Sequence, residues 1–301
     1  MPNWNQVLEE INGYPNVNPL DAIRRKYLKL LHEKTGRNII AYYSGFLQKP
    51  KDANTIINDD DKNGLMAAIH QLDRTKGLDL LLHTPGGESA ATESIVDYLR
   101  RMFDINIRAI IPQIAMSAGT MIACSCNKII MGKQSNIGPI DPQFGGIPAH
   151  GVIAEFEEAI KKIKEDPSKI PLYQVIVGKY HPTFIGECQN AIDLSSDMVK
   201  KWLTTGMFKN KATAEALAQT IVNYLNNHED TKTHARHIHI DEAKSIGLEI
   251  LDMEEDQEMQ DNILTIHHAY MHAFANSTAT KIIENHNGNA VVFHSPQIFT
   301  R

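Results

Sequence analysis

The sequence predicts an α/β protein built on a mainly parallel β-sheet. Residues 78–82 and 105–111 are two largely apolar runs, and each is followed by a turn of small residues and then by a segment with helical patterning. A third short run, residues 128–131, follows the second helical segment. Apolar strands separated by helices are typical of a parallel sheet that is covered on both faces. Ligands of such sheets gather where the strands end.

The chain before this sheet is predicted to be helical and then to contribute one early strand. Residues 1–34 carry apolar positions at helical spacing, interrupted by Pro15 and Pro19. Residues 37–47 are rich in Ile and Tyr and are predicted as the first strand. Residues 48–63 are polar, and the three aspartates at 59–61 are interpreted as a solvated acidic loop that caps the next helix, not as a cation site.

Helices and loops alternate through the rest of the chain. The Gly- and Pro-rich loop at 132–151 is expected to form a wall beside the ligand site. Asp241 is expected to cap a short helix that Gly247 ends. The predicted helices span residues 65–72, 88–103, 117–126, 152–164, 199–203, 212–225, 242–245 and 257–286, and residues 290–294 are predicted as a closing strand.

Composition narrows the class of protein. The 301 residues are 42% hydrophobic and 22% charged, which is ordinary for a globular protein. The formal net charge of −6 gives no reason to expect non-specific binding to nucleic acid. The chain begins without a signal-peptide layout and has no apolar run of membrane-spanning length. Three cysteines do not make a disulfide framework, so we expect buried thiols and a cytoplasmic location.

No metal or cofactor is expected. His268 and His272 share a helical face at zinc-binding spacing, but Ala269 stands where a zinc-metalloprotease motif has glutamate. The histidines at 234, 237 and 239 form a polar cluster without carboxylate or thiolate ligands in metal spacing.

Two turns at predicted strand ends carry the candidate chemistry. The first is His83-Thr84-Pro85-Gly86-Gly87, and the second is Gln113-Ile-Ala-Met-Ser117-Ala-Gly-Thr120. A strand that ends in two glycines leaves backbone N–H groups free to bind a developing oxyanion. A serine at the start of a helix lies where the helix dipole favours negative charge. We therefore predict that Ser117 is a nucleophile and that Gly86-Gly87 helps form its oxyanion hole. His83 is expected to be hydrogen-bonded to a neighbouring loop.

At Thr84-Pro-Gly-Gly87, Ala115-Met-Ser-Ala-Gly-Thr-Met-Ile-Ala123 and Ser135-Asn-Ile-Gly138 the chain resembles the ClpP/crotonase superfamily. It is most similar to the SppA-like and NfeD-like serine peptidases and to the serine dehydrogenase proteinase group. The resemblance covers residues 37–250. It implies a ClpP/crotonase-like fold of repeated β-β-α units in a spiral, with added N- and C-terminal helices. It also implies Ser117 as nucleophile, and the backbone N–H groups of Gly87 and Ala118 as oxyanion donors, with Gly86 shaping the turn.

The general base is open at this stage. The resemblance places the lysine of SppA-like enzymes at His181, with Lys179 two residues before it, and the histidine of ClpP-like enzymes where Ile140-Asp141 stands. A histidine deprotonates serine without the burial that a lysine needs. His181 is therefore the first candidate, Lys179 the second, and a residue not yet singled out the third possibility. Asp141 is expected to orient the histidine, as a third group does in triads.

These expectations define the predicted organisation and function. The predicted domains are a helical extension at 1–36, a catalytic domain at 37–250 and a helical extension at 251–301. The predicted function is a cytoplasmic serine peptidase that cleaves peptides or unfolded proteins through a Ser117 acyl-enzyme. The alternatives are a crotonase-type acyl-CoA enzyme and a non-catalytic assembly module. A homo-oligomer is expected from the resemblance.

Overall fold

A mostly parallel sheet forms the centre of the molecule in the computed structural model, which describes residues 3–15, 18–50, 52–227 and 233–295. The first five strands, in spatial order, are parallel, and the last two are antiparallel to their neighbours. This is the α/β sheet that the apolar runs predicted. The order within the described residues is β10 (Ile250–Asp252), β5 (Lys128–Met131), β3 (Ile107–Ile111), β2 (Leu78–His83), β1 (Asn38–Ser44), β11 (Ala279–Asn285) and β12 (Ala290–His294).

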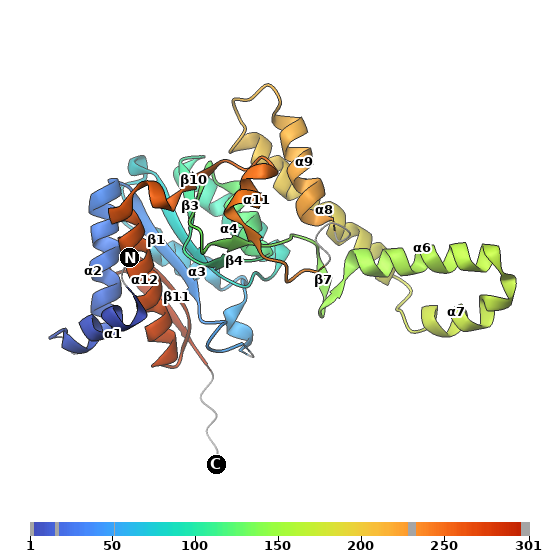
Figure 1. The fold of residues 1–301 in the computed structure, drawn as a ribbon, viewed down its shortest axis with the longest axis horizontal. Coiled ribbons are helices and arrows are strands. Elements are labelled where there is room, and N and C mark those ends of the chain that lie inside the picture. Colours follow the sequence, from blue (N-terminus) through green and yellow to red (C-terminus); the bar gives the residue numbers. More distant parts are fainter. Residues whose placement is uncertain (1–2, 16–17, 51, 228–232, 296–301) are drawn as a thin grey trace, which may run out of the picture.

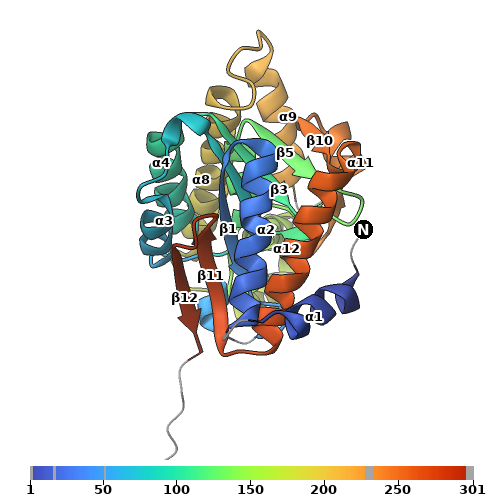
Figure 2. The ribbon, with the colours of Figure 1, turned by 90° about the vertical axis from the view of Figure 1, so that its left-hand side faces the viewer.

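Helices cover both faces of this sheet (Figures 1 and 2). On one face, α2 (Pro19–Thr35) and α12 (Gln257–Ala275) lie side by side, with α1 (Trp4–Gly13) packed against them. The other face is covered by α3 (Asp61–Ile69), α4 (Ser89–Phe103), α5 (Ala118–Ser125), α8 (Phe184–Thr205) and α9 (Ala214–Asn226). Successive side chains of a strand point to opposite faces, so the apolar strands supply a separate core to each helical layer.

A second, smaller sheet lies where the strands of the large sheet end. It consists of β4 (Ile114–Ala115), β6 (Asn136–Ile137) and β9 (Ile238–His239), in that spatial order. Each of β3 and β5 leads directly into a strand of this small sheet, and β4 then enters α5. This β-β-α unit agrees with the ClpP-like fold that the resemblance implied. The remaining short elements are the hairpin of β7 (Gln143–Phe144) and β8 (Ile147–Pro148), and α11 (Ile240–Ser245).

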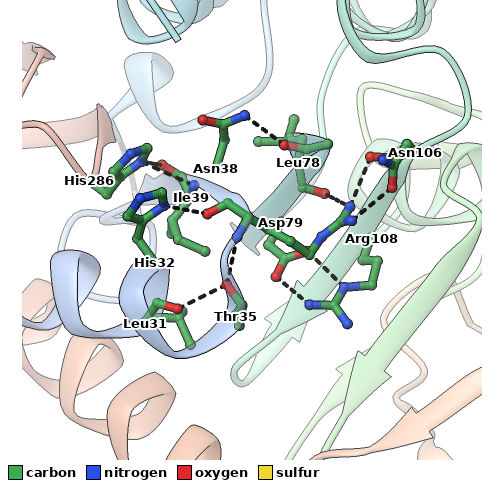
Figure 3. Close-up of polar contacts among 12 residues, drawn as sticks. Leu31, His32, Thr35, Asn38, Ile39, Leu78, Asp79, Asn106, Arg108 and His286 are labelled. Atoms are coloured by element: carbon green, nitrogen blue, oxygen red, sulfur yellow. Dashed lines mark hydrogen bonds and ion pairs between the residues drawn. The ribbon is translucent and has the colours of Figure 1, made fainter. Parts of the chain in front are cut away.

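The opposite, amino-terminal ends of β1, β2 and β3 are joined by a charged network (Figure 3). The Asp79 side chain is fully buried and accepts two hydrogen bonds from the Arg108 guanidinium, at 2.7 and 2.5 Å. The Nε of Arg37 donates a third at 2.6 Å. A buried carboxylate needs such partners, since it would otherwise carry an uncompensated charge. The charged groups at this edge of the sheet therefore have a structural role.

The C-terminal segment corrects one prediction. A single helix was expected over 257–286, but α12 ends at Ala275 and β11 begins at Ala279. The break falls at Asn276 and Ser277, whose side chains bond to backbone carbonyls of the last helical turn, as such residues do in competition with helix. β11 then pairs with β1. The segment predicted as a helical extension thus supplies two sheet strands, including the predicted closing strand at 290–294.

The acidic loop is also different from the prediction at its last residue. Asp61 is not solvated: its side chain is fully buried and forms an ion pair with Lys281 of β11. Sequence patterning gave no sign of this contact, because the two residues lie 220 positions apart.

Two further helices form an arm that projects away from the sheet (Figure 1). They are α6 (Ala149–Glu165) and α7 (Ile170–Val177), and residues 178–183 lead back into α8. Within the described part of the chain, no helix combines the length and the apolar character that a membrane span requires. Cys124, Cys126 and Cys188 are free and buried, as expected.

Candidate active site

Ser117 occupies the junction between β4 and α5 in an uncommon backbone conformation. Its φ and ψ are 51° and −116°, and positive φ is unfavourable for any residue with a Cβ. Such strain persists only where surrounding structure holds it, and it is concentrated at functional sites. The side chain is partly exposed and makes no capping hydrogen bond to its own helix. The hydroxyl is therefore free to meet a substrate.

The Gly-Gly turn lies directly against this serine. A Cβ built on Gly86 would stand 2.7 Å from the Ser117 Cβ and 2.9 Å from the Met116 carbonyl oxygen. Only glycine fits there, and Gly86 also has φ +100°. Thr84 holds the Gly-Gly turn beside the serine segment, because its N–H donates to Ile114 O (3.1 Å) and its carbonyl accepts from Met116 N–H (3.0 Å).

Two backbone N–H groups near Ser117 are without partners among the described residues. Gly86 O accepts from Ile57 N–H (2.8 Å), and Glu88 N–H donates to Ile57 O (2.9 Å). In this extended pairing the intervening Gly87 N–H points away from Ile57. The second free donor is the N–H of Ala118, which opens α5 and would lie 3.1 Å from a Cβ on Gly86. The Ala118 N–H therefore lies beside the Gly86-Gly87 turn, and these two N–H groups are the candidate donors for an oxyanion.

Asp141 pairs with a histidine that sequence reasoning did not choose. The Nδ1 of His234 lies 2.8 Å from Asp141 Oδ1. The other carboxylate oxygen accepts a hydrogen bond from Gln143 Nε2 (2.8 Å). The Asp141 side chain is fully buried, whereas that of His234 is 28% exposed. With Nδ1 turned to the carboxylate, the proton-transfer role in a serine–histidine–aspartate site would fall to Nε2.

The small sheet brings this pair to the edge that carries Ser117. β6 is parallel to β4 and antiparallel to β9, so the chain leaving β4, the chain leaving β6 and the chain entering β9 meet at one edge. Ser117, Asp141 and His234 lie on these three segments in that order. The segments touch beyond the paired residues, since a Cβ on Gly138 would lie 2.3 Å from Met116 Cε and 3.5 Å from Arg236 O.

Comparison with known proteins shows the family of the chain. The model of the ClpP-like SDH-type serine proteinase family matches residues 14–278. The chain belongs to this family. Two relatives are uncharacterized proteins of Methanocaldococcus jannaschii, 29% identical over 64% of this chain and 34% identical over 36% of it. The chain spans 59% of the length of the first relative and 36% of the second.

The candidate bases chosen from the sequence lie elsewhere in the molecule. Lys179 and His181 are exposed and stand between α7 and α8, on the projecting arm. Figure 1 shows α7 far from β4, the strand that precedes Ser117. The Nδ1 of His181 contacts Thr183 Oγ1 at 3.1 Å. Asp141, which was expected to orient His181, contacts His234 instead. A single chain therefore does not bring Lys179 or His181 to the serine.

His83 and His272 have structural surroundings. His83 is fully buried between the rings of Tyr43, Phe46 and His267, on the α2–α12 face of the sheet. Neither ring nitrogen has a partner that meets hydrogen-bond geometry among the described residues, so the expected bond to a neighbouring loop is not formed. The Ile114 carbonyl still acts on the ring electrostatically and favours its protonated form. His272 packs on Trp4 of α1. Among the described residues, no group of three or more His, Cys, Asp or Glu is arranged to hold a metal ion.

Sequence reasoning missed His234 because its partner is distant. The pair is separated by 93 residues, and the local sequence around His234 offers three histidines with no carboxylate in metal spacing. The one available sign was Asp141 itself, a carboxylate four residues past the end of β6, the strand that runs beside β4.

Proposed function

We propose that the protein is a serine peptidase with Ser117 as nucleophile, His234 as general base and Asp141 as the group that orients the base. The observation that carries this proposal is the Asp141–His234 pair at the small-sheet edge where Ser117 emerges. Membership in a serine proteinase family supports it. The partly exposed Ser117 and His234 next to a buried carboxylate have the exposure that a serine–histidine–aspartate site needs.

The proposed reaction follows the usual two steps. His234 Nε2 takes the Ser117 proton as Oγ attacks the peptide carbonyl, and the Asp141 carboxylate stabilises the imidazolium. The N–H groups of Gly87 and Ala118 bind the oxyanion of the tetrahedral intermediate. His234 then protonates the leaving amine, and water, activated by the same histidine, hydrolyses the acyl-enzyme. Removing one oxyanion donor typically costs about a hundredfold to a thousandfold in kcat.

The proposed substrates are peptides or unfolded proteins, the proposed location is the cytoplasm, and the proposed assembly is a homo-oligomer. The arm supports the assembly. α7 has no buried residue, and Leu172 and Val175 expose 60% and 65% of their surface. Exposed apolar groups in such a cluster mark interaction sites. Ile160 of α6 is 54% exposed and stands between glutamates at 157 and 158 and lysines at 161, 162 and 164. Antiparallel contact between two copies would therefore pair opposite charges.

The experiment is labelling with a fluorophosphonate probe, which reacts with activated serines. We expect the wild-type protein to be labelled at Ser117 and Ser117→Ala to be unlabelled. His234→Ala should lose labelling by about a thousandfold, as removal of a triad base does. Asp141→Asn should lose labelling strongly as well, because it no longer holds the histidine in the required tautomer.

Lys179→Ala and His181→Ala are the matched controls, since both side chains are exposed and their loss does not disturb the core. Their labelling should stay within about twofold of wild type. Loss of labelling in His181→Ala but not in His234→Ala would reject the proposed base. Turnover of a crotonyl thioester that survives Ser117→Ala would favour the acyl-CoA enzyme instead.

A further inference from the structure

The Gly-Gly turn depends on a loop from outside the predicted nucleophile region. Ile57 binds the turn from both sides, through its N–H to Gly86 O and its carbonyl to Glu88 N–H. Contact is close enough that a Cβ on Gly87 would stand 2.3 Å from Ile57 O and 2.4 Å from Ile57 N. The place of the Gly87 N–H is therefore set by the place of residues 56–58.

Residues 56–58 are held in turn by one buried ion pair. The Lys281 ammonium donates to Ile56 O at 2.6 Å and to Asp61 Oδ1 at 2.6 Å. The other oxygen of Asp61 accepts from Asn58 N–H at 3.0 Å. The two members of the pair thus bind the residues on either side of Ile57. Tyr42 OH completes the site by donating to Asp61 Oδ2 at 2.6 Å.

Burying the Lys281–Asp61 pair costs desolvation free energy, and a gain in stability does not explain why the pair is buried. The Lys281 side chain is 1% exposed and that of Asp61 is 0% exposed. Burial lowers the pKa of Lys281, and the Asp61 carboxylate opposes this shift. A buried ion pair of this kind contributes little net stability relative to apolar residues of similar size, because desolvation offsets the attraction. The ion pair instead provides a donor and an acceptor in fixed positions, which bind specific backbone groups.

We propose that Lys281 and Asp61 are positioning residues for the oxyanion turn. Strand β11 reaches the site through them: Lys281 and Asp61 fix residues 56–58, which fix Gly86-Gly87 against Ser117. This proposal rests on the proposed function for its catalytic consequence, but the mechanical link from Lys281 to the turn is testable without activity. Neither residue touches the substrate.

The molecule contains a matched control on the same strand. Glu284 of β11 forms a buried ion pair with Arg24 at 2.7 Å, with side-chain exposures of 0% and 2%. Tyr270 OH donates to Glu284 at 2.6 Å, just as Tyr42 OH does to Asp61. Neither Arg24 nor Glu284 bonds to residues 56–58. Arg24→Met removes the closer of two cations from Glu284, which keeps Arg25 Nε at 3.4 Å. Lys281→Met removes the ammonium that pairs with Asp61, and only this second variant releases the loop.

The first measurement is hydrogen exchange of backbone amides in the full-length protein. In Lys281→Met, exchange in residues 55–59 and 84–90 should rise by about tenfold or more relative to Arg24→Met, at matched global stability. Equal exchange of these two segments in both variants would overturn the proposal. This readout does not require that the wild-type protein be a peptidase.

The second measurement is the concentration dependence of fluorophosphonate labelling. A misplaced Gly87 N–H reduces stabilisation of the transition state but does not change initial binding of the probe. The maximal labelling rate of Lys281→Met should therefore fall by about tenfold to a hundredfold. The probe concentration that gives half the maximal rate should stay unchanged. Arg24→Met should keep both values near wild type. An equal fall in both variants would show a general structural effect and reject the positioning role.

A milder pair of variants covers the case in which Lys281→Met does not fold. Tyr42→Phe and Tyr270→Phe each remove one hydroxyl that donates a hydrogen bond to a buried carboxylate. Tyr42→Phe should increase exchange at 84–90 and slow labelling, and Tyr270→Phe should do neither. If wild-type Ser117 is not labelled at all, the proposed function fails. The exchange results then still decide whether Lys281 and Asp61 hold the turn.

Discussion

Ser117 and Gly86 fit together at the scale of single residues because each accepts a conformation that most residues avoid. Ser117 has φ 51°, and Gly86 has φ +100°. The serine carries strain of about 1–3 kcal/mol. The turn at Thr84 and the start of α5 maintain this strain through backbone hydrogen bonds. The strained backbone of Ser117 places its hydroxyl at the start of α5, where the helix N-terminus favours anionic intermediates.

This strain predicts a difference between two inactive variants. Ser117→Gly should be more stable than Ser117→Ala by about 1 kcal/mol, because glycine adopts this φ without steric cost while alanine keeps the strain. Both variants should lack fluorophosphonate labelling. Urea unfolding measures the difference. Equal or greater stability of Ser117→Ala would show that the serine backbone is relaxed.

A second residue-scale prediction concerns Gly87. Gly87→Ala places a Cβ against the Ile57 backbone, which cannot rotate away as a side chain would. The turn must shift, and labelling of Ser117 should fall by about a hundredfold or more. Gly186 is the control, since it lies in α8 and a Cβ there meets no atom within 4 Å. Gly186→Ala should label like wild type. Full labelling of Gly87→Ala would remove the turn from the proposed site.

At the scale of elements, β2 and α12 bury two histidine rings against each other. His83 and His267 have ring centroids 5.2 Å apart. Burial lowers the pKa of His83 to about 3, and the Ile114 carbonyl offsets only part of this effect. The pKa of His267 is also lowered, by burial and by the neighbouring histidines. Both rings are therefore neutral in the folded protein at neutral pH.

These neutral rings predict acid sensitivity. An unfolded histidine has a pKa near 6.5, so below that pH the unfolded chain binds a proton that folded His83 excludes until about pH 3. Stability is thus lost as pH falls through this window. His83→Phe should reduce the dependence by up to about 1.4 kcal/mol per pH unit. Urea unfolding at pH 7.5, where the ring is neutral in both states, is the reference. An unchanged slope between about pH 6 and 4.5 would contradict the expectation.

At the scale of the whole molecule, the arm exposes apolar surface that packing within one chain does not account for. α6 and α7 project from the body (Figure 1), and α7 buries none of its eight residues. Among the described residues, a small hydrophobic cluster around Val152 and Cys188 joins the arm to α8. An arm that exposes large apolar side chains suits contact with another copy.

The proposed homo-oligomer gives a prediction for this arm. Leu172→Glu combined with Val175→Glu should shift the protein to smaller species in analytical ultracentrifugation, because charge replaces apolar surface at the contact. Thermal stability of the body should change little, since both side chains are more than half exposed. Lys169→Glu, a change at a partly exposed position at the same end of the arm, is the control. Assembly that is unaffected by the double variant would place the contact elsewhere.

Local patterns in the sequence determined the sheet, the serine turn and the glycine turn. A parallel strand buried on both faces is apolar within its own few residues, and a glycine required at positive φ is visible at its own position. The family resemblance depended on these same stretches. The final helix was predicted 11 residues too long, ending at 286 where α12 ends at Ala275, because helical periodicity alone does not reveal that β1 has a free edge for β11 to pair with.

Only the tertiary structure decided which charged groups meet. The pairs Asp141–His234 and Asp61–Lys281 join residues 93 and 220 positions apart. Nothing in the local sequence of either partner specifies the other. Asp61 stands among polar residues, which is the pattern of a solvated loop, and Asp141 stands in a Gly- and Pro-rich loop. Their contacts are set by strand order, in which β9 lies beside β6 and β11 lies beside β1. Local sequence therefore determined the proposed nucleophile and the turn beside it, and the sheet topology decided the proposed base and the residues that hold the turn.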